Sequence, residues 1–312
     1  MSERKPPAFK ENFKQKYAQI LGDELEEFLS CSITPLNPVM RVNTLKITKK
    51  EMIERIKKKG WEYRLESFYD NAITITKKDQ PIGNTKEHFL GYYYVQEKAS
   101  MLPPLAMDLK LGQTVLDVAA SPGSKTSQIS QELNNTGIIL ANDINLGRVS
   151  ILKSNLQRMG CMNTLISLYN GVFLNNLNTE FDRILVDAPC TATGTIRRNW
   201  HVINQYNPNS AMELSKLQKP LLNTAYKLLK ENGVLVYSTC SLEVEENELV
   251  INQFLQKNPE AKIEKVKYKG LKTRPGITNW EKYDIDSRIK NATRIYPQDN
   301  DSEGFFVTRI RK

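Results

Sequence analysis

Two cysteines follow neighbouring strands of a predicted sheet, where each could act as a nucleophile. Residues 184–186 predict a strand that leads into Asp187-Ala188-Pro189-Cys190, and 234–237 predict one that leads into Ser238-Thr239-Cys240-Ser241. A single cysteine after a buried strand is usually a small hydrophobic residue of the core. Two at equivalent positions favour thiolate chemistry, provided that cationic neighbours or a helix N-terminus lower a thiol pKa that is ordinarily about 8.5. For Cys240 we expect a following helix, beginning near Glu243.

A loop of small residues after the first strand could hold an anionic ligand group. The strand covers 115–120 and continues into Ser121-Pro122-Gly123-Ser124-Lys125-Thr126, with a helix predicted from near Ser127. Unpaired amides at a helix N-terminus favour a carboxylate or another anion. The alternative is an ordinary strand-to-helix turn. A phosphate-binding P-loop is excluded because Ser124 and Ala119 stand where that motif needs glycines.

The second strand ends in Ala141-Asn142-Asp143. An acid after this strand is well placed to accept hydrogen bonds from ribose hydroxyls, which implies a cofactor that contains a nucleoside. Asp143 could equally cap the helix that we expect to begin near Leu146.

These residues need a doubly wound parallel α/β sheet to bring them together. Strand candidates at 114–120, 138–144, 164–169, 182–188 and 233–239 alternate with helical stretches, and ligands of such sheets lie beyond the carboxyl ends of the strands.

Three parts of the chain are predicted. Apolar residues at four-residue intervals predict an amphipathic helix over 9–29. Thr48 and Glu51 then form a capping-box pattern within a mixture of short strands and helices. We therefore predict an N-terminal helical segment at 1–36, a small α+β domain at 37–91 and a large catalytic domain at 92–312.

The composition favours a polyanionic partner such as a nucleic acid, and a basic enzyme without such a partner is the equal alternative. The 312 residues include 44 Lys and Arg against 35 Asp and Glu, giving a net charge of +9. Four dispersed cysteines and two separate histidines indicate neither a zinc site nor a disulfide framework. Residues 1–8 lack an apolar leader and no stretch is long enough to span a bilayer, so we expect a cytoplasmic protein without a metal, in monomeric form.

Six short motifs together resemble the NOL1/NOP2/Sun family of RNA cytosine-5 methyltransferases, and its archaeal-type tRNA members in particular. They occur in the family order, from about residue 40 to the end of the chain. The motifs are Arg41-Val42-Asn43-Thr44-Leu45, Gly91-Tyr92-Tyr93-Tyr94-Val95-Gln96-Glu97-Lys98-Ala99-Ser100, the loop 120–126, Asp187-Ala188-Pro189-Cys190, Ser238-Thr239-Cys240-Ser241 and Gly304-Phe305-Phe306. Each alone is weak, but six in this order are specific.

The resemblance implies a Rossmann-like class I methyltransferase fold with S-adenosylmethionine in the crevice. The methionine end of the cofactor would lie on the loop 119–125 and its ribose on Asp143, while the position of residue 170 and Asp187 would complete the pocket. The cofactor contacts implied in this way are Ala119, Ala120, Ser121, Pro122, Gly123, Ser124, Lys125, Asp143, Asn170 and Asp187.

The resemblance also implies that Cys240, rather than Cys190, attacks the base. Carbon 5 of cytosine is too poor a nucleophile to take a methyl group from a sulfonium unaided, and addition of a thiolate at C6 turns the ring into an enamine. Asp187 would lie near N3 and favour its protonation as charge develops. Cys190 would then assist the release of Cys240.

A target base must leave its stack to reach such a crevice, which costs least in single-stranded or loop RNA. Four residues after the first cysteine motif could grip a phosphate and stack on a base, or form a solvated basic loop: Arg197, Arg198, Trp200 and His201. The small domain and the basic stretch 262–294, with Tyr268, Trp280 and Tyr283, are further candidate RNA surfaces.

Three departures from the family pattern stand out. Thr191-Ala192-Thr193-Gly194 replaces the usual Ser-Gly-x-Gly, Asn170 replaces a common Asp, and Gln298 replaces a frequent His. Asn170 can still accept a hydrogen bond from the adenine amino group through its carbonyl oxygen. We expect tRNA as the substrate, with rRNA second.

Three rival functions remain to be weighed. One is a catalytically weak RNA-binding assembly factor that keeps the fold and the cofactor pocket. Another is an amino-group methyltransferase, which would need an aromatic residue where Cys190 stands. The third is a nicotinamide oxidoreductase, which would need a G-x-G-x-x-G loop.

Overall fold

The computed structural model describes residues 7–312, so the expectation for residues 1–8 falls mostly outside the described residues. The chain begins with two helices, α1 (Glu11–Leu21) and α2 (Leu25–Ser32), joined by a 3₁₀ turn at Gly22–Glu24. We predicted one helix over 9–29. Gly22 interrupts it because its backbone takes a φ of 56°, a conformation that glycine adopts without strain.

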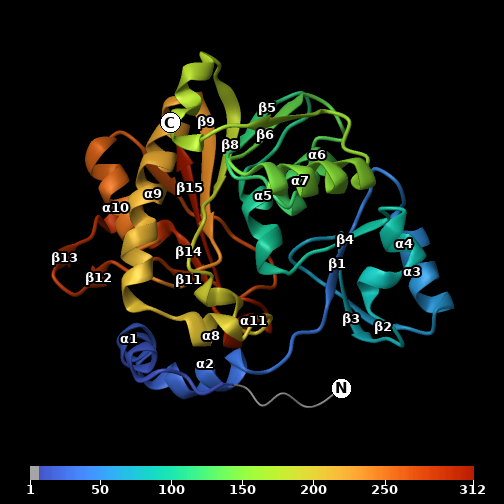
Figure 1. The fold of residues 1–312 in the computed structure, drawn as a ribbon, viewed down its shortest axis with the longest axis horizontal. Coiled ribbons are helices and arrows are strands. Elements are labelled where there is room, and N and C mark those ends of the chain that lie inside the picture. The colour runs from blue at the N-terminus through green and yellow to red at the C-terminus, as the bar shows by residue number, and fades with distance from the viewer. Residues whose placement is uncertain (1–6) are drawn as a thin grey trace.

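The two N-terminal helices pack against the large domain (Figure 1). Phe13, Tyr17 and Phe28 are buried in one apolar cluster with Ile203 and Tyr206. The amphipathic stripe seen in the sequence is therefore a docking face for the catalytic part of the chain.

The small domain is a four-stranded antiparallel sheet with strand order β2-β3-β1-β4. Its elements are β1 (Val39–Val42), α3 (Lys49–Lys58), β2 (Glu62–Leu65), β3 (Ala72–Lys77), a 3₁₀ turn (Ile82–Asn84), α4 (Lys86–Phe89) and β4 (Tyr93–Val95). The capping box of Thr48 and Glu51 is confirmed at the start of α3. Because β4 pairs with β1, the sheet continues past Gly91, where we expected the small domain to end.

Buried polar side chains of β1 hold the small domain against the large one. Arg41 is fully buried, and its guanidinium donates to Gln96 Oε1 (2.8 Å), Ser124 O (2.7 Å) and Ser127 Oγ (2.7 Å). Asn43 Nδ2 donates to Met159 O (2.7 Å) at the end of α7 (Leu146–Met159). This part of the Arg41-Val42-Asn43 motif therefore positions the start of the helix that follows the small-residue loop.

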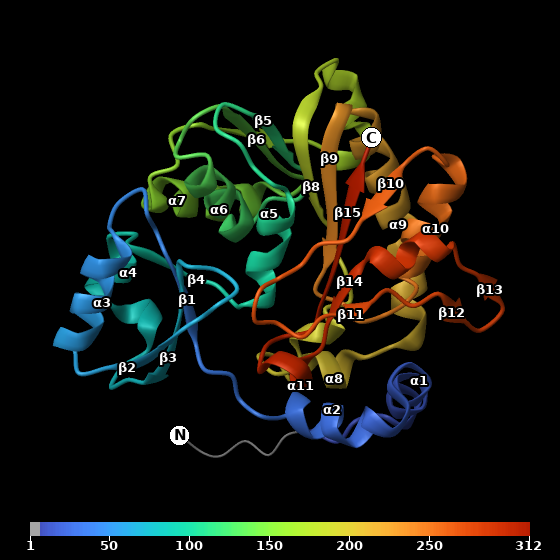
Figure 2. The same cartoon turned by 180° about the vertical axis from the view of Figure 1, so that it is seen from behind.

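The large domain is a nine-stranded mixed sheet with helices on both faces (Figure 2). Its main path runs β11-β14-β15-β9-β8-β5-β6-β7, with β10 paired to β15. The strands are β5 (Thr114–Asp117), β6 (Ile138–Asp143), β7 (Thr164–Leu168), β8 (Phe181–Asp187), β9 (Leu229–Thr239), β10 (Lys262–Glu264), β11 (Arg274–Pro275), β14 (Thr293–Ile295) and β15 (Phe305–Arg311). The α/β class is confirmed, but the sheet is parallel only from β7 to β9, since β15 enters antiparallel beside β9.

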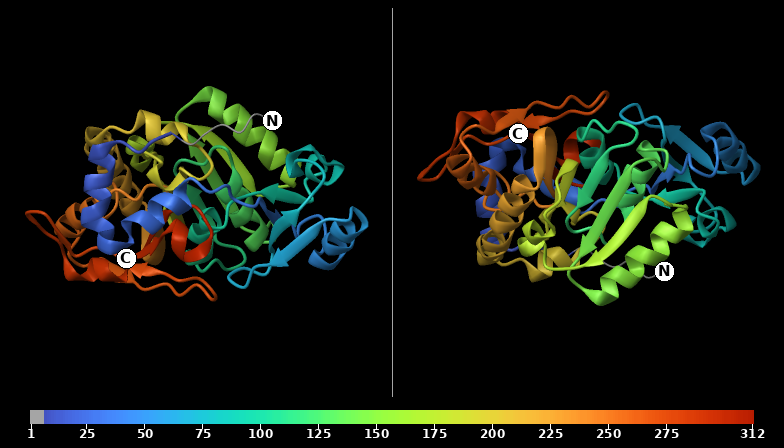
Figure 3. Two further views of the ribbon diagram at one scale, coloured as in Figure 1. Left: turned by 90° about the horizontal axis from the view of Figure 1, so that it is seen from below. Right: turned by 90° about the horizontal axis from the view of Figure 1, so that it is seen from above.

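The connections carry α5 (Leu102–Ala106), α6 (Ser124–Glu132), α7, α8 (His201–Gln205), α9 (Pro208–Lys227), α10 (Glu248–Lys257) and α11 (Pro297–Asn300), with 3₁₀ turns at Ala99–Met101, Gly171–Leu177, Thr193–Thr195 and Ser287–Asn291. Two large apolar clusters fill the two faces of the sheet. Figure 3 shows the small domain at one end of the molecule and the C-terminal elements at the other. None of the helices within residues 7–312 is long and apolar enough to cross a membrane.

The basic stretch 262–294 forms β10, β11, a hairpin of β12 (Asn279–Trp280) and β13 (Tyr283–Asp284), a 3₁₀ turn and the start of β14. Tyr268 and Trp280 are buried in the two main clusters. These two aromatic side chains belong to the core, so they do not contribute to the RNA surface that we expected at 262–294.

Candidate active site

A cavity of about 420 Å³ opens beyond the carboxyl ends of the parallel strands. Residues at the ends of five strands, β5 to β9, meet at it, as expected for ligand sites of doubly wound sheets. Its lining is Val118, Ala119, Ser121, Asn142, Asp143, Ile144, Arg148, Asn170, Gly171, Asp187, Ala188, Pro189, Cys190, Leu217, Leu221 and Cys240. Both cysteines and both aspartates singled out in the sequence therefore face one space.

The small-residue loop contributes only part of what the sequence suggested. Ala119 and Ser121 line the cavity, whereas five of the predicted cofactor contacts are not among the described residues that line it: Ala120, Pro122, Gly123, Ser124 and Lys125. Gly123 is the N-cap of α6 with a φ of 99°, and Ser124 O accepts from Arg41. The loop shapes the cavity wall, and Lys125 reaches Asp187, which lines the cavity.

Lys125 forms a buried ion pair with Asp187, whose Oδ2 lies 2.7 Å from the Nζ atom. Ser238 Oγ donates to the other oxygen of Asp187, also at 2.7 Å. Burial opposes the charge of Lys125, but the carboxylate of Asp187 and then the charge of Cys240 raise its pKa above the usual value. A protonated lysine thus lies within electrostatic reach of Cys240.

The two thiols are in contact, with 3.3 Å between the Sγ atoms of Cys190 and Cys240. The hydrogen bond to Cys240, followed by burial and by the charges of Cys240 and Glu246, raises the pKa of Cys190 well above its usual value. Cys190 therefore remains a thiol near neutral pH.

The helix that we expected to stabilise a Cys240 thiolate begins further along the chain. α10 starts at Glu248, not near Glu243, because the intervening residues fold back on Thr239. Asn247 Oδ1 accepts from Thr239 Oγ1 (2.6 Å), and Asn247 Nδ2 donates to Ser241 O (2.9 Å). Lys125, rather than a helix N-terminus, supplies the positive charge beside the thiol.

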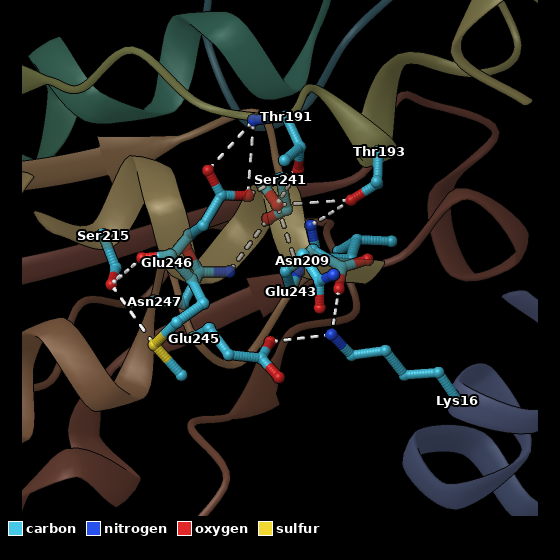
Figure 4. A network of polar contacts seen from close by, with 12 residues as sticks. Lys16, Thr191, Thr193, Asn209, Ser215, Ser241, Glu243, Glu245, Glu246 and Asn247 are labelled. Atoms are coloured by element: carbon cyan, nitrogen blue, oxygen red, sulfur yellow. Dashed lines mark hydrogen bonds and ion pairs between the residues drawn. The ribbon is translucent and has the colours of Figure 1, made fainter. Parts of the chain in front are cut away.

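A buried network fixes the loops that carry the two cysteines (Figure 4). Glu246 accepts from the backbone amide of Thr191 (3.0 Å) and from Gln218 Nε2 (2.9 Å). Ser241 Oγ lies 3.0 Å from Thr191 Oγ1 and 3.2 Å from Thr193 Oγ1. Thr191, which replaces the usual Ser of the family pattern, and Thr193 thus tie the Cys190 loop to the Cys240 loop.

The N-terminal helix α1 supports the same loops from outside (Figure 4). Tyr17 donates its hydroxyl to Glu243 Oε1 (2.9 Å), and Lys16 forms ion pairs with Glu243 and with Glu245 (2.8 Å). This contact could not be predicted from the sequence, because the residues involved are more than 200 positions apart.

Two glycines let three active-site loops approach one another. The amide of Gly194 donates to Cys240 O (2.9 Å), and the amide of Gly304 donates to Gly194 O (2.8 Å). A Cβ atom on Gly194 would lie 2.2 Å from Gly304 O. Gly304 of the Gly304-Phe305-Phe306 motif therefore helps to position the backbone of Cys240.

Ala192 has a left-handed backbone, with a φ of 58°, at a position where the family usually has glycine. This conformation destabilises a residue with a Cβ by roughly 1–2 kcal/mol. A glycine avoids that cost but loses about 0.5–1 kcal/mol more in chain entropy on folding. We expect Ala192→Gly to raise the free energy of unfolding by up to about 1 kcal/mol, measured by urea denaturation. The matched control is Ala18→Gly within α1, which should lower it by about 1 kcal/mol; a loss of stability in both variants would contradict the explanation.

Asp143, which we expected to hold the ribose of the cofactor, lines the cavity within a network of hydrogen bonds. Its Oδ2 accepts from the Ser121 amide (3.3 Å) and pairs with Arg148 Nε (3.1 Å), while Oδ1 accepts from the Asn145 amide (3.1 Å). The side chain that caps α7 is Asn145, so Asp143 is not the N-cap. Sequence reasoning missed Arg148, which lines the cavity beside Asp143.

Asn170 lines the cavity as expected, and its Oδ1 already accepts the Val172 amide (3.1 Å). A carbonyl oxygen has two lone pairs, so the adenine amino group can still donate to this atom. The donor and acceptor set of the cavity thus fits a nucleoside cofactor.

Asp117, at the end of β5, is a buried acid behind the cavity. Burial, reinforced by the charge of Asp187, raises its pKa to about 7, although Thr126 Oγ1 donates to it at 2.7 Å. In the unfolded chain the same acid ionises near pH 4, so its contribution to stability falls as the pH rises from about 4 to about 7.

We expect Asp117→Asn, which does not titrate, to gain stability relative to wild type between pH 5 and pH 8 in urea unfolding. An equal stability difference at the two pH values would contradict this pKa.

The four predicted RNA contacts separate into buried and exposed residues. Arg197 is buried, and its guanidinium donates to Thr34 O (2.9 Å) and pairs with Asp301 (2.9 Å), so it holds the N-terminal segment and we withdraw it as an RNA contact. Trp200 packs against the cluster that buries α1 and α2. Arg198 and His201 remain exposed.

The mixed sheet, the cavity at its carboxyl edge and the acids that surround it define a class I methyltransferase with a site for a nucleoside cofactor. Comparisons with known proteins then give the family. The family described as 16S rRNA methyltransferase RsmB/F matches residues 104–311, and the N-terminal domain of 16S rRNA methyltransferase RsmF matches residues 9–98.

Relatives of known name point the same way. The tRNA (cytosine(49)-C(5))-methyltransferase of Pyrococcus abyssi is 39% identical over 311 residues, covering 97% of this chain and 99% of that protein. The ribosomal RNA small subunit methyltransferase F of Vibrio atlanticus is 38% identical over 294 residues, and the match spans 60% of its length. The crystal structure of a methyltransferase homolog from Pyrococcus horikoshii superimposes with a TM-score of 0.87 at 36% identity, covering 98% of this chain and 96% of that one.

The chain belongs to the RsmB/F family of S-adenosylmethionine-dependent RNA (cytosine-5) methyltransferases. The family, the fold and the cofactor predicted from the sequence are thereby confirmed. Among residues 7–312, no group of three or more His, Cys, Asp or Glu side chains could hold a metal ion.

Proposed function

We propose that this chain methylates carbon 5 of a cytosine in tRNA, with Cys240 as the nucleophile and Cys190 as the group that permits its release. The observation that carries the proposal is the contact of the two thiols, 3.3 Å apart, on the wall of the cavity that Asp187 also lines. S-adenosylmethionine, when bound, supplies the methyl group as an electrophile.

The first step needs a thiolate at Cys240. The protonated Lys125 favours negative charge there, while Cys190 keeps its own proton and donates a hydrogen bond across the pair. The Cys240 sulfur forms a bond to C6 of the cytosine, and the ring electrons move to N3 as C5 becomes an enamine carbon. Asp187, held in place by Lys125 and Ser238, faces the cavity and stabilises N3 as it gains a proton.

The release step uses the same two cysteines, but here Cys190 acts on the C5 proton and Cys240 is the leaving group. Two of the effects that raise the pKa of Cys190 come from Cys240, namely its hydrogen bond and its charge. Both effects are lost once the Cys240 sulfur is bonded to C6, so the pKa of Cys190 falls at that stage. Cys190 can then help to remove the proton from C5, after which the C5–C6 double bond re-forms and the bond between sulfur and C6 breaks.

tRNA is the proposed substrate because the Pyrococcus abyssi relative, named for cytosine 49 of tRNA, matches this chain over 99% of its own length. The relatives named for ribosomal RNA extend well beyond the match, which spans 60% of the one from Vibrio atlanticus.

A substrate assay tests this assignment. The protein is incubated with tritiated S-adenosylmethionine and either unmodified tRNA transcripts or 16S rRNA, and label is located by digestion to nucleosides. We expect 5-methylcytidine in tRNA, and its disappearance when position 49 of the transcript is changed to uridine. Label confined to 16S rRNA would reject tRNA as the substrate while keeping the chemistry.

A further inference from the structure

A second cavity, of about 340 Å³, lies where the three parts of the chain meet. We call it the junction cavity. It is lined by 35–39, which link α2 to β1, by 95–97 at the end of β4, and by Arg197, Arg198 and Glu303. These residues come from the N-terminal segment, the small domain and the catalytic domain.

Two backbone hydrogen bonds connect the wall of the junction cavity to the backbone of Cys240. Glu303 precedes Gly304, whose amide donates to Gly194 O (2.8 Å), and the amide of Gly194 in turn donates to Cys240 O (2.9 Å). Arg198 lies in the loop that continues from Cys190. A group bound in this cavity would therefore lie close to a cytosine attached to Cys240.

The walls combine apolar surfaces with a few polar groups. Pro35, Leu36, Pro38, Val39 and Val95 supply the apolar part. Such a lining suits a planar aromatic ring, whose faces are apolar and whose edges carry donors and acceptors.

Among the polar side chains of this cavity, Glu303 and Arg198 form an ion pair with each other, and neither side chain makes a hydrogen bond to any other residue that the structure describes. Glu97 already accepts from the amides of Ala99 (2.6 Å) and Glu303 (3.0 Å). The Glu303 side chain is only 2% exposed, and its Oε1 lies 3.0 Å from Arg198 Nε but accepts no hydrogen bond from the residues that the structure describes. The ion pair with Arg198 offsets part of the cost of burying this oxygen, and a bound donor would supply the hydrogen bond that the oxygen lacks.

The protonation state of Glu303 limits the chemical groups that could form hydrogen bonds to it in the junction cavity. Burial, and then the charge of Glu97, raise the pKa of Glu303 to about 8, although Arg198, Lys125 and Arg197 oppose the shift. Near neutral pH the carboxyl group therefore presents one donor and one acceptor. Adenine and cytosine carry a matching pair, an amino group beside a ring nitrogen, on one edge.

We infer that the junction cavity binds the base of a nucleotide adjacent to the target cytosine, with Glu303 reading its edge and Arg198 contacting its phosphate. The inference rests on the proposed function, since it needs an RNA whose cytosine is held at Cys240. It makes Glu303 a specificity-determining residue outside the cofactor cavity.

The test measures kcat/KM on a panel of tRNA transcripts in which the nucleotide on either side of the target is changed to each of the other bases. We expect wild type to discriminate by about tenfold or more at one of these positions. Glu303→Leu should lose this preference. Glu303→Gln should keep it, because an amide also offers one donor and one acceptor.

Arg198→Met supplies a second readout. We expect it to raise KM about equally for all transcripts and to leave kcat and the order of base preference unchanged, since a phosphate contact carries no sequence information. Lys216→Met, which removes an exposed lysine of α9 outside the junction cavity and outside the candidate RNA surfaces, is the matched control and should leave KM unchanged.

The outcomes separate this inference from the function on which it rests. A wild type that methylates every transcript equally, or a Glu303→Leu variant that retains the preference, would overturn the inference and keep the proposed function. Failure of wild type to methylate any transcript would instead overturn the proposed function.

Discussion

Replacement of Cys240 by alanine is expected to abolish methyl transfer, with a loss in kcat on the order of 10⁴-fold or more, as when other enzymes lose their nucleophile. Without addition of the thiolate at C6, carbon 5 of cytosine has too little electron density to accept the methyl group. The measurement is the incorporation of tritium from S-adenosylmethionine into 5-methylcytidine under single-turnover conditions, where product release does not limit the rate.

The control for Cys240→Ala is Cys161→Ala. Cys161 packs against a small apolar cluster away from the cavity, and burial raises the pKa of its thiol. That variant should retain activity even if it loses some stability. A Cys240→Ala protein that methylates tRNA at a rate within tenfold of wild type would rule out Cys240 as the nucleophile.

Cys190→Ala is expected to stop turnover at a different stage. The variant keeps the Cys240 sulfur and the Lys125–Asp187 pair, so attack and methyl transfer should proceed. Removal of the C5 proton then lacks its helper, so protein and RNA remain joined. We expect a species on denaturing gels that contains both protein and labelled RNA, in an amount close to the enzyme concentration, and at least a hundredfold loss in steady-state turnover, within the range that positioned acids and bases contribute.

The double variant Cys190→Ala, Cys240→Ala provides the control for that species, and it should form none. If Cys190→Ala turns over at the wild-type rate, the release step proposed for Cys190 is wrong. If it forms no adduct and transfers no methyl group, Cys190 is required before the methyl transfer rather than after it.

Much of the candidate site was predictable because parallel strands place their carboxyl ends at one edge. Asp143, Asp187, Cys190 and Cys240 each follow a strand that the alternating pattern identified, so their convergence followed from topology alone. The capping box at Thr48 was predictable for a similar reason, since it depends on residues three positions apart.

The parts that could not be predicted depend on contacts between distant residues. Nothing local in the sequence shows that Arg197 turns inward to Thr34 and Asp301, or that Tyr17 donates to Glu243. The antiparallel entry of β15 beside β9 was hidden for a related reason, because a buried apolar strand has the same pattern in either direction. The delayed start of α10 reflects the side-chain hydrogen bonds of Asn247, which compete with helix formation.

The departures from the family pattern also take on a physical meaning in the structure. Thr191 replaces the usual Ser and keeps a hydroxyl there, and with Thr193 it connects the two cysteine loops through Ser241. The remaining rival, a catalytically weak assembly factor, would bind RNA and S-adenosylmethionine and show no transfer in the wild-type protein.

The central claim is that Cys240, and not Cys190, bonds to C6 of the target cytosine. The most direct measurement is mass spectrometry of the species trapped with Cys190→Ala and tRNA, after digestion with protease and ribonuclease. The mechanism predicts a peptide containing Cys240 that carries a methylated cytidine nucleotide. A nucleotide found on any other residue, or a Cys240→Ala variant that forms an adduct through Cys190, would contradict it.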